Sequence, residues 1–144
     1  MPPLVANKQS AVLEALCAQY PQIRRAGFMK ALRGAFPSIV EAELDDFARV
    51  PDGFVVRAED DEVDVFEVEI THPLDDRSMR DFAFFWAALD SLEVGMRLHV
   101  VNRYGHINEV DLAAYYYHAI KAEVDKAPPG TWDLPDEDEE DAAT

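Results

Sequence analysis

Apolar residues recur at helical spacing near the start of the chain. From Lys8 to Tyr20 they stand three or four positions apart, which predicts an amphipathic helix. A second helix is expected from Gln22 to Ala35, because Pro21 interrupts the first helix and Pro37 ends the second. The sequence therefore opens with two helices, preceded by a short arm over residues 1–7.

The middle of the chain holds two short apolar runs. Strands are predicted at Phe54 to Arg57 and at Val63 to Thr71, joined by a charged turn. The segment from Ser38 to Asp46 is ambiguous, because its composition also suits a helix.

The second half of the chain alternates helix and strand. A helix is predicted from Arg77 to Leu92, a strand from Met96 to Asn102, and a last helix from Asn108, as its cap, to Lys126. The strand–helix–strand order implies a parallel pair of strands. Apolar side chains on two sides of the helix from Arg77 to Leu92 mean that it is covered twice or forms a homodimer contact.

Length and composition favour one globular domain. The 144 residues suit a single domain over residues 1–130, and the acid-rich segment from Thr131 to Thr144 is expected to be a disordered tail. The single cysteine, Cys17, excludes an internal disulfide and a cysteine-based zinc site. With no signal peptide and no apolar stretch of membrane-spanning length, we expect a soluble, cytoplasmic protein without a membrane partner.

The net charge of −16 at pH 7 bears on the partners. Nucleic-acid binders normally carry a basic surface, so this charge counts against a nucleic-acid partner and suits a basic protein partner. Part of the excess is local, because seven acids and no basic residue follow Lys126. An acidic chain can still bind DNA through a local basic patch and a cleft that contains a metal ion.

Two glutamates, Glu67 and Glu69, stand one residue apart in an apolar strand. Their side chains share one face, and neighbouring carboxylates in a buried strand cost free energy unless a cation lies between them. Asp52, before the preceding strand, would add a third carboxylate if the two strands pair as a hairpin. Since hard cations prefer carboxylate oxygens, the pattern predicts that these three acids are ligands of Mg²⁺ or Mn²⁺.

At Pro51-Asp52 and Glu67-Val68-Glu69 the sequence resembles the PD-(D/E)xK nuclease superfamily. The pattern of that family is Pro-Asp, a gap of roughly one hairpin, and then an acid, any residue and a lysine. The chain departs from it at Glu69, although some restriction endonucleases carry glutamate there. The resemblance covers roughly residues 40–103. It implies a single α/β (α+β) domain with a mixed central sheet of about four strands, a restriction-endonuclease-like core, and a catalytic role for Asp52, Glu67 and Glu69.

The family also implies where accessory groups would lie. Its earlier strand, which pairs with the Asp-bearing one, favours a strand from Ile39 to Leu44 and makes Glu43 an additional acid. The sequence itself adds three candidates: His72, next to the carboxylate pair, as a base or phosphate ligand, and Arg77 or Arg80, near the start of the following helix, as a replacement for the missing lysine. For each of these four residues, an ordinary exposed side chain is the alternative.

The resemblance implies a nuclease or nuclease-like protein that depends on Mg²⁺ and acts on nucleic-acid phosphodiesters. The net charge and the absent lysine support an alternative, a catalytically inactive nuclease fold that presents an acidic surface to a basic protein. A third possibility is an assembly protein that dimerises through the helix from Arg77 to Leu92.

Overall fold

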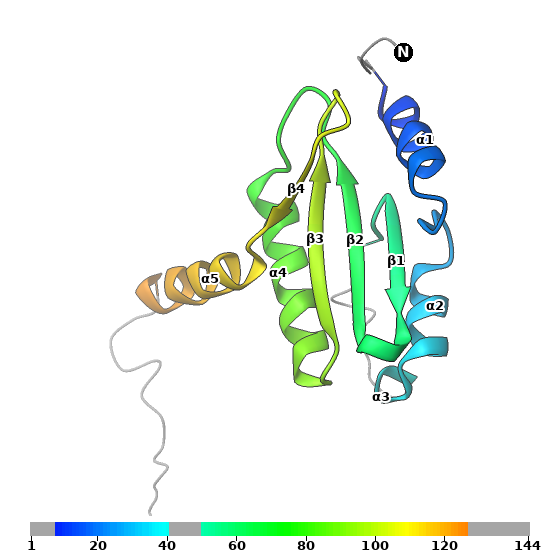
Figure 1. The fold of residues 1–144 in the computed structure, drawn as a ribbon. Coiled ribbons are helices and arrows are strands. Elements are labelled where there is room, and N and C mark those ends of the chain that lie inside the picture. Colours follow the sequence, from blue (N-terminus) through cyan, green and yellow to red (C-terminus); the bar gives the residue numbers. More distant parts are fainter. Residues whose placement is uncertain (1–7, 41–49, 127–144) are drawn as a thin grey trace, which may run out of the picture.

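The computed structural model describes residues 8–40 and 50–126, which form one α/β domain around a four-stranded mixed sheet (Figure 1). The helices are α1 (Gln9–Gln19), α2 (Phe28–Ala35), α3 (Pro37–Val40), the short 3₁₀ helix η1 (Ala58–Asp60), α4 (Asp76–Ser91) and α5 (Leu112–Lys126). The strands are β1 (Gly53–Arg57), β2 (Glu62–Val68), β3 (Gly95–Val101) and β4 (Ile107–Val110). The predicted single domain with a mixed sheet of four strands is confirmed. Glu43 and the acidic tail lie outside the described residues.

The four strands lie side by side in the order β1-β2-β3-β4. β1 and β2 form an antiparallel hairpin in which Phe54 is opposite Val65. β2 and β3 run parallel, with Val65 opposite Leu98, and α4 makes the connection between them. β4 then returns antiparallel to β3. The predicted hairpin and the predicted parallel pair are therefore both present.

The two faces of the sheet are covered by different helices. α2 and α4 pack on the face that carries Phe54, Val65 and Leu98, which belong to the larger hydrophobic cluster. α1 packs on the opposite face, where Phe66 and Val101 near the carboxyl ends of β2 and β3 join the smaller cluster. In Figure 1, α1 lies beside the arrowheads of these two strands, and α4 runs along the sheet.

α5 covers the second apolar side of α4. The ring of Tyr116 lies 5.4 Å from that of Phe84 and 5.9 Å from that of Trp86, measured between centroids. The two-sided apolar pattern of α4 is thus explained within the chain. Exposed aromatic side chains lie instead on α5, where Tyr117 is 68% exposed and Tyr115 is 38% exposed. The homodimer contact through the helix from Arg77 to Leu92 stays a prediction.

Two predictions for the first half of the chain are wrong at their boundaries. The second helix begins at Phe28 rather than Gln22, because Arg24 forms a two-residue antiparallel bridge with Phe54 and Gly27 adopts a left-handed conformation (φ +78°). Ile39 was expected in a strand but lies in α3, fully buried. Burial of Ile39 in the core satisfies its apolar side chain without a strand.

The last helix also begins later than the sequence predicts. Asn108, the expected helix cap, lies in β4 opposite Val100, so the fourth strand of the sheet comes from this segment. The cap is Asp111, whose Oδ1 accepts a hydrogen bond from the N–H of Ala114 (3.1 Å). Pairing with β3 therefore overrides the local capping signal at Asn108.

Replacing Gly53 with alanine is expected to lower the free energy of unfolding by about 1–3 kcal/mol, because a Cβ there would lie 2.8 Å from Cγ2 of Ile23. Gly34→Ala is the matched control, since a Cβ in that part of α2 meets nothing within 4 Å. It should raise stability by about 0.5–1 kcal/mol. Urea denaturation measures both variants, and equal effects of the same sign would contradict the close packing of Ile23 on β1.

Candidate functional site

Asp52 and Glu67 come together at the carboxyl end of β2. Because β1 runs antiparallel to β2, the residue before β1 lies beside the last residues of β2. The N–H of Asp52 donates to Oε2 of Glu67 (2.9 Å), and the N–H of Val68 donates to Oδ2 of Asp52 (2.9 Å). These two hydrogen bonds hold the pair of carboxylates in a defined orientation at the end of the hairpin.

The surroundings of the pair are partly closed to solvent. Glu67 is only 7% exposed, and Asp52 is half-buried. The side-chain amide of Gln9, in the first turn of α1, donates to Oδ2 of Asp52 (2.5 Å). Both groups that donate to the carboxylate of Asp52 are therefore neutral amides. Among the described residues, no cationic side chain forms an ion pair with Asp52.

Glu69, the third predicted ligand, stabilises the turn that leads to α4. Its N–H donates to the carbonyl oxygen of Val101 (2.8 Å), and its Oε2 accepts from the N–H of Leu74 (2.8 Å). β2 ends at Val68 rather than at the predicted Thr71, because the chain bends after Glu69 to make this second contact. The structure thus gives Glu69 a structural contact that the sequence did not predict.

The accessory residues are distributed over the same end of the sheet and over α4. His72 is exposed in the turn after β2, and Arg77 is exposed in the first turn of α4. Arg80 points toward α5, where it forms an ion pair with Glu123 (2.9 Å). Its guanidinium carbon also lies 5.6 Å from the centroid of the Phe84 ring. Arg80 is thus paired with a carboxylate, whereas Arg77 forms no ion pair with the described residues.

Two of the three predicted metal ligands, Asp52 and Glu67, are linked through backbone hydrogen bonds at the end of β2. Among residues 8–40 and 50–126, no group of three His, Cys, Asp or Glu side chains is placed to hold a metal ion. Mg²⁺ commonly binds one or two carboxylates and completes its coordination with water and substrate phosphates. A metal ion at Asp52 and Glu67 stays a prediction, and the described residues contain no preformed three-carboxylate site that includes Glu69.

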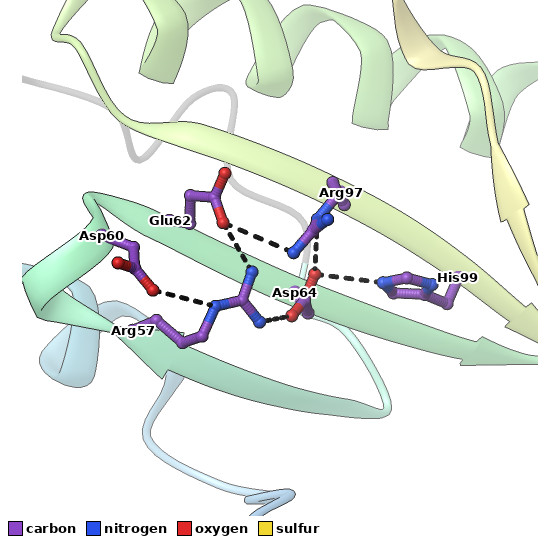
Figure 2. A network of polar contacts seen from close by, with 6 residues as sticks. All are labelled: Arg57, Asp60, Glu62, Asp64, Arg97 and His99. Carbon is purple, nitrogen blue, oxygen red and sulfur yellow. Dashed lines mark hydrogen bonds and ion pairs between the residues drawn. The ribbon is translucent and has the colours of Figure 1, made fainter.

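A second polar cluster lies on the same face of the sheet as Phe66 and Val101, nearer the other end of the strands (Figure 2). Asp64 lies at its centre and accepts hydrogen bonds from Arg57, from Arg97 (3.1 Å) and from His99 (3.1 Å). Glu62 also contacts both guanidinium groups, at 2.7 Å from Arg57 and 3.4 Å from Arg97. We call these five residues the Asp64 network. They connect β1, β2 and β3 across the sheet.

Electrostatics hold Asp64 in its charged form. Burial raises the pKa of this carboxyl group, but hydrogen bonds from His99 and Arg57 and the charges of Arg57 and Arg97 lower it to about 2. The hydrogen bonds to Glu62 and Asp64 in turn raise the pKa of Arg57. Both oxygens of Asp64 are engaged by protein donors, so the network serves the stability of the sheet rather than metal binding.

The sequence contained only part of the signal for this network. An aspartate between Val63 and Val65 in an apolar strand requires a partner, because a buried unpaired charge is costly. Its partners, however, are distant in the sequence: Arg57 lies 7 positions before it, and Arg97 and His99 lie 33 and 35 positions after it. The parallel pairing of β2 with β3, which places Asp64 opposite Arg97, was needed to identify them.

No family model, curated protein or solved structure matches this chain. In the described residues, no helix is long and apolar enough to cross a membrane. The geometry of the residues themselves, and chiefly of the pair Asp52 and Glu67, is therefore the guide to function.

Proposed function

We propose that this chain is a metal-dependent nuclease-like protein with a restriction-endonuclease-like core, acting on nucleic-acid phosphodiesters. The observation that carries the proposal is a pair of hydrogen bonds of 2.9 Å, from the N–H of Asp52 to Oε2 of Glu67 and from the N–H of Val68 to Oδ2 of Asp52. Two acids 15 residues apart in the sequence, at the positions that resemble the nuclease motif, lie together at one end of the sheet. Support also comes from the antiparallel hairpin followed by a parallel strand, because a helix–strand–strand–helix–strand order accompanies the motif.

In this proposal Asp52 and Glu67 would hold Mg²⁺ at the carboxyl end of β2. When bound there, the ion would polarise a phosphoryl oxygen and lower the pKa of an attacking water. The backbone N–H groups of Asp52 and Val68 keep the two carboxylates oriented before any ligand arrives. Preorganised ligands reduce the cost of ordering side chains on binding, which favours metal affinity at a two-carboxylate site.

The cation that the family usually supplies from its lysine would come from elsewhere. Glu69 cannot offset negative charge that develops on phosphate, and Arg80 is held by Glu123. Arg77 is exposed in the first turn of α4, which begins seven residues after Glu69. We assign it the role of contacting the phosphate, with His72 in the intervening turn as a second candidate for that contact.

A second candidate function is binding of a basic protein without catalysis. The observation in its favour is that Arg57, Arg80 and Arg97 are engaged by carboxylates of the same chain, in a protein whose net charge is −16. Each of these arginines already neutralises a carboxylate of the same chain, and the remaining excess of negative charge favours a cationic partner. A response to divalent metal separates this candidate from the nuclease-like one.

Millimolar Mn²⁺ is expected to raise the melting temperature of the parent protein, because a ligand that binds only the folded state stabilises it by mass action. At a concentration 100 times the dissociation constant, the gain is about 2.7 kcal/mol. Asp52→Asn with Glu67→Gln should abolish this rise and the Mg²⁺-dependent nicking of a plasmid. Both replacements keep an acceptor oxygen for the N–H groups of Val68 and Asp52, so the hairpin should fold.

Glu59→Gln with Asp61→Asn is the matched control, since it removes two negative charges from an exposed turn. Asn also tolerates the left-handed backbone of Asp61 (φ 53°). The control should respond to Mn²⁺ as the parent does. If the Asp52/Glu67 variant keeps the full response, the metal site at the end of β2 is wrong. If the parent neither binds metal nor nicks DNA, the nuclease-like function is wrong.

A further inference from the structure

A basic segment interrupts the acidic chain between α1 and α3. No Asp or Glu occurs between Glu14 and Glu41, whereas this stretch contains four of the thirteen basic residues of the protein. They are Arg24, Arg25, Lys30 and Arg33. In a chain with a net charge of −16, this segment is a local region of opposite sign.

Three of these side chains differ from the arginines of the sheet in their ion pairs. Arg24, Arg25 and Lys30 are exposed, and none of them forms an ion pair with a residue in the ranges 8–40 and 50–126. Arg57 and Arg97, in contrast, are bound to carboxylates of the Asp64 network. The three exposed cations therefore keep their capacity to bind an anion from outside the chain.

The backbone holds this segment against the candidate site. Arg24 and Phe54 exchange two hydrogen bonds, from N–H to carbonyl oxygen, at 2.8 and 2.9 Å. Phe54 is two residues from Asp52 in the sequence. The bridge therefore places the backbone of Arg24 beside the start of β1, at roughly 5 Å, the spacing of neighbouring strands. Close packing supports the same placement, because a Cβ on Gly53 would meet Ile23 at 2.8 Å.

The side chains extend the basic region from this bridge along α2. The guanidinium carbon of Arg24 lies 5.3 Å from the centroid of the Phe54 ring, at the turn where Gly27 begins α2. Phe28 and Leu32 face the core, which puts Lys30 on the outer side of the helix. In Figure 1, α2 and the link from α1 lie along the outer edge of β1.

We propose that Arg24, Arg25 and Lys30 form a surface, the β1-edge basic surface, that binds the phosphate backbone of a nucleic acid and positions it at Asp52 and Glu67. This inference rests on the proposed function, since it assigns the partner of the same site. Arg and Lys contact phosphates irrespective of base sequence, so the surface supplies affinity and position without sequence preference. It also explains how a chain of net charge −16 could approach a polyanion, by presenting a local region of positive charge beside its carboxylates.

The test measures binding separately from cleavage. Fluorescence anisotropy with a labelled 20-base DNA, single-stranded and duplex, is recorded in EDTA for the full chain over a series of salt concentrations. The parent should bind at low salt. Arg25→Gln with Lys30→Gln should weaken binding to both DNA forms and reduce the slope of log K against log salt by about 2, roughly one for each phosphate contact that is lost.

Lys121→Gln with Lys126→Gln is the matched control, because it removes the same charge from exposed positions of α5, which Figure 1 shows on the opposite side of the sheet. This control should leave the slope as in the parent. The proposed surface is wrong if the parent does not bind DNA. It is also wrong if the Arg25/Lys30 variant has the same salt slope as the parent. Displacement of the DNA by poly-glutamate at equal charge concentration also overturns it, since the surface would then bind acidic proteins generally.

Failure of the surface and failure of the proposed chemistry give different results. Asp52→Asn with Glu67→Gln should retain DNA binding in EDTA, because neither residue belongs to the basic surface. If DNA binds through Arg25 and Lys30 while the parent neither binds metal nor nicks, the surface stands and the nuclease-like function is wrong. If metal binding and nicking depend on Asp52 and Glu67 but the slope does not change in the Arg25/Lys30 variant, the function stands and the surface is wrong.

Discussion

Replacing Asp64 with asparagine is expected to lower the free energy of unfolding by about 2–3 kcal/mol at pH 7. The carboxylate is 6% exposed and is bound by Arg57, Arg97 and His99, so its loss leaves two guanidinium groups facing a neutral amide. Removing one partner of a buried charge network costs more than the pair itself contributes. Partial exposure of both arginines keeps the effect below that of a fully buried pair. Urea denaturation of the parent and the variant measures the difference.

Asp60→Asn is the control within the same region of the sheet. The Asp60 side chain is 59% exposed and lies 3.8 Å from Nε of Arg57, at the rim of the network (Figure 2). Exposed ion pairs contribute little, so this variant should stay within about 0.5 kcal/mol of the parent. If Asp64→Asn and Asp60→Asn unfold at the same urea concentration, Asp64 contributes no more to stability than the exposed Asp60. Its assignment as the centre of the network would then be wrong.

The stability difference between the parent and Asp64→Asn should depend on pH in one direction only. The pKa of Asp64 is about 2 in the folded protein and about 3.9 in an unfolded chain. A lowered folded pKa contributes stability that is fully present above the unfolded value and is lost as the pH falls through the folded value. The difference should therefore be constant from about pH 7 to pH 5 and should shrink between about pH 4 and pH 2. A difference that grows on acidification would contradict the lowered pKa.

Glu69→Lys is expected to raise Mg²⁺-dependent plasmid nicking on the order of 10²-fold. The change restores the acid-x-lysine arrangement on the strand face that also carries Glu67, and it supplies a cation where negative charge develops on phosphate. The cost is the hydrogen bond from Leu74 to Oε2 of Glu69, about 1 kcal/mol of stability. Nicking is measured as the initial rate at saturating Mg²⁺, and urea denaturation measures the stability.

Glu69→Gln separates the two effects of this substitution. Glutamine keeps an acceptor for the N–H of Leu74 and removes the charge without adding a cation, so its nicking rate should stay near that of the parent. A fall in nicking with both variants would mean that the carboxylate of Glu69 itself takes part in the chemistry. If Glu69→Lys leaves nicking, metal affinity and stability unchanged, residue 69 does not face the site, and the assignment of the site is wrong.

The local periodicity of the sequence determined most of the secondary structure. Short apolar runs on either side of a charged turn predict β1 and β2, and helical spacing predicts α1 and α4. The order of these elements also predicts the hairpin and the parallel pair. The approach of Asp52 to Glu67 follows from the same hairpin, so this part of the candidate site could be inferred without a structure.

The tertiary structure alone decided which segment completes the sheet and which charges meet. Ile39 suits a strand or a helix, and burial within the core selects the helix. Asn108 suits a helix cap, but pairing with β3 places it in the fourth strand. Local propensity differs too little between these states to resolve them, whereas tertiary contacts contribute more. For the same reason the partners of Asp64, up to 35 positions away, became visible only once parallel pairing had set the register of β2 and β3.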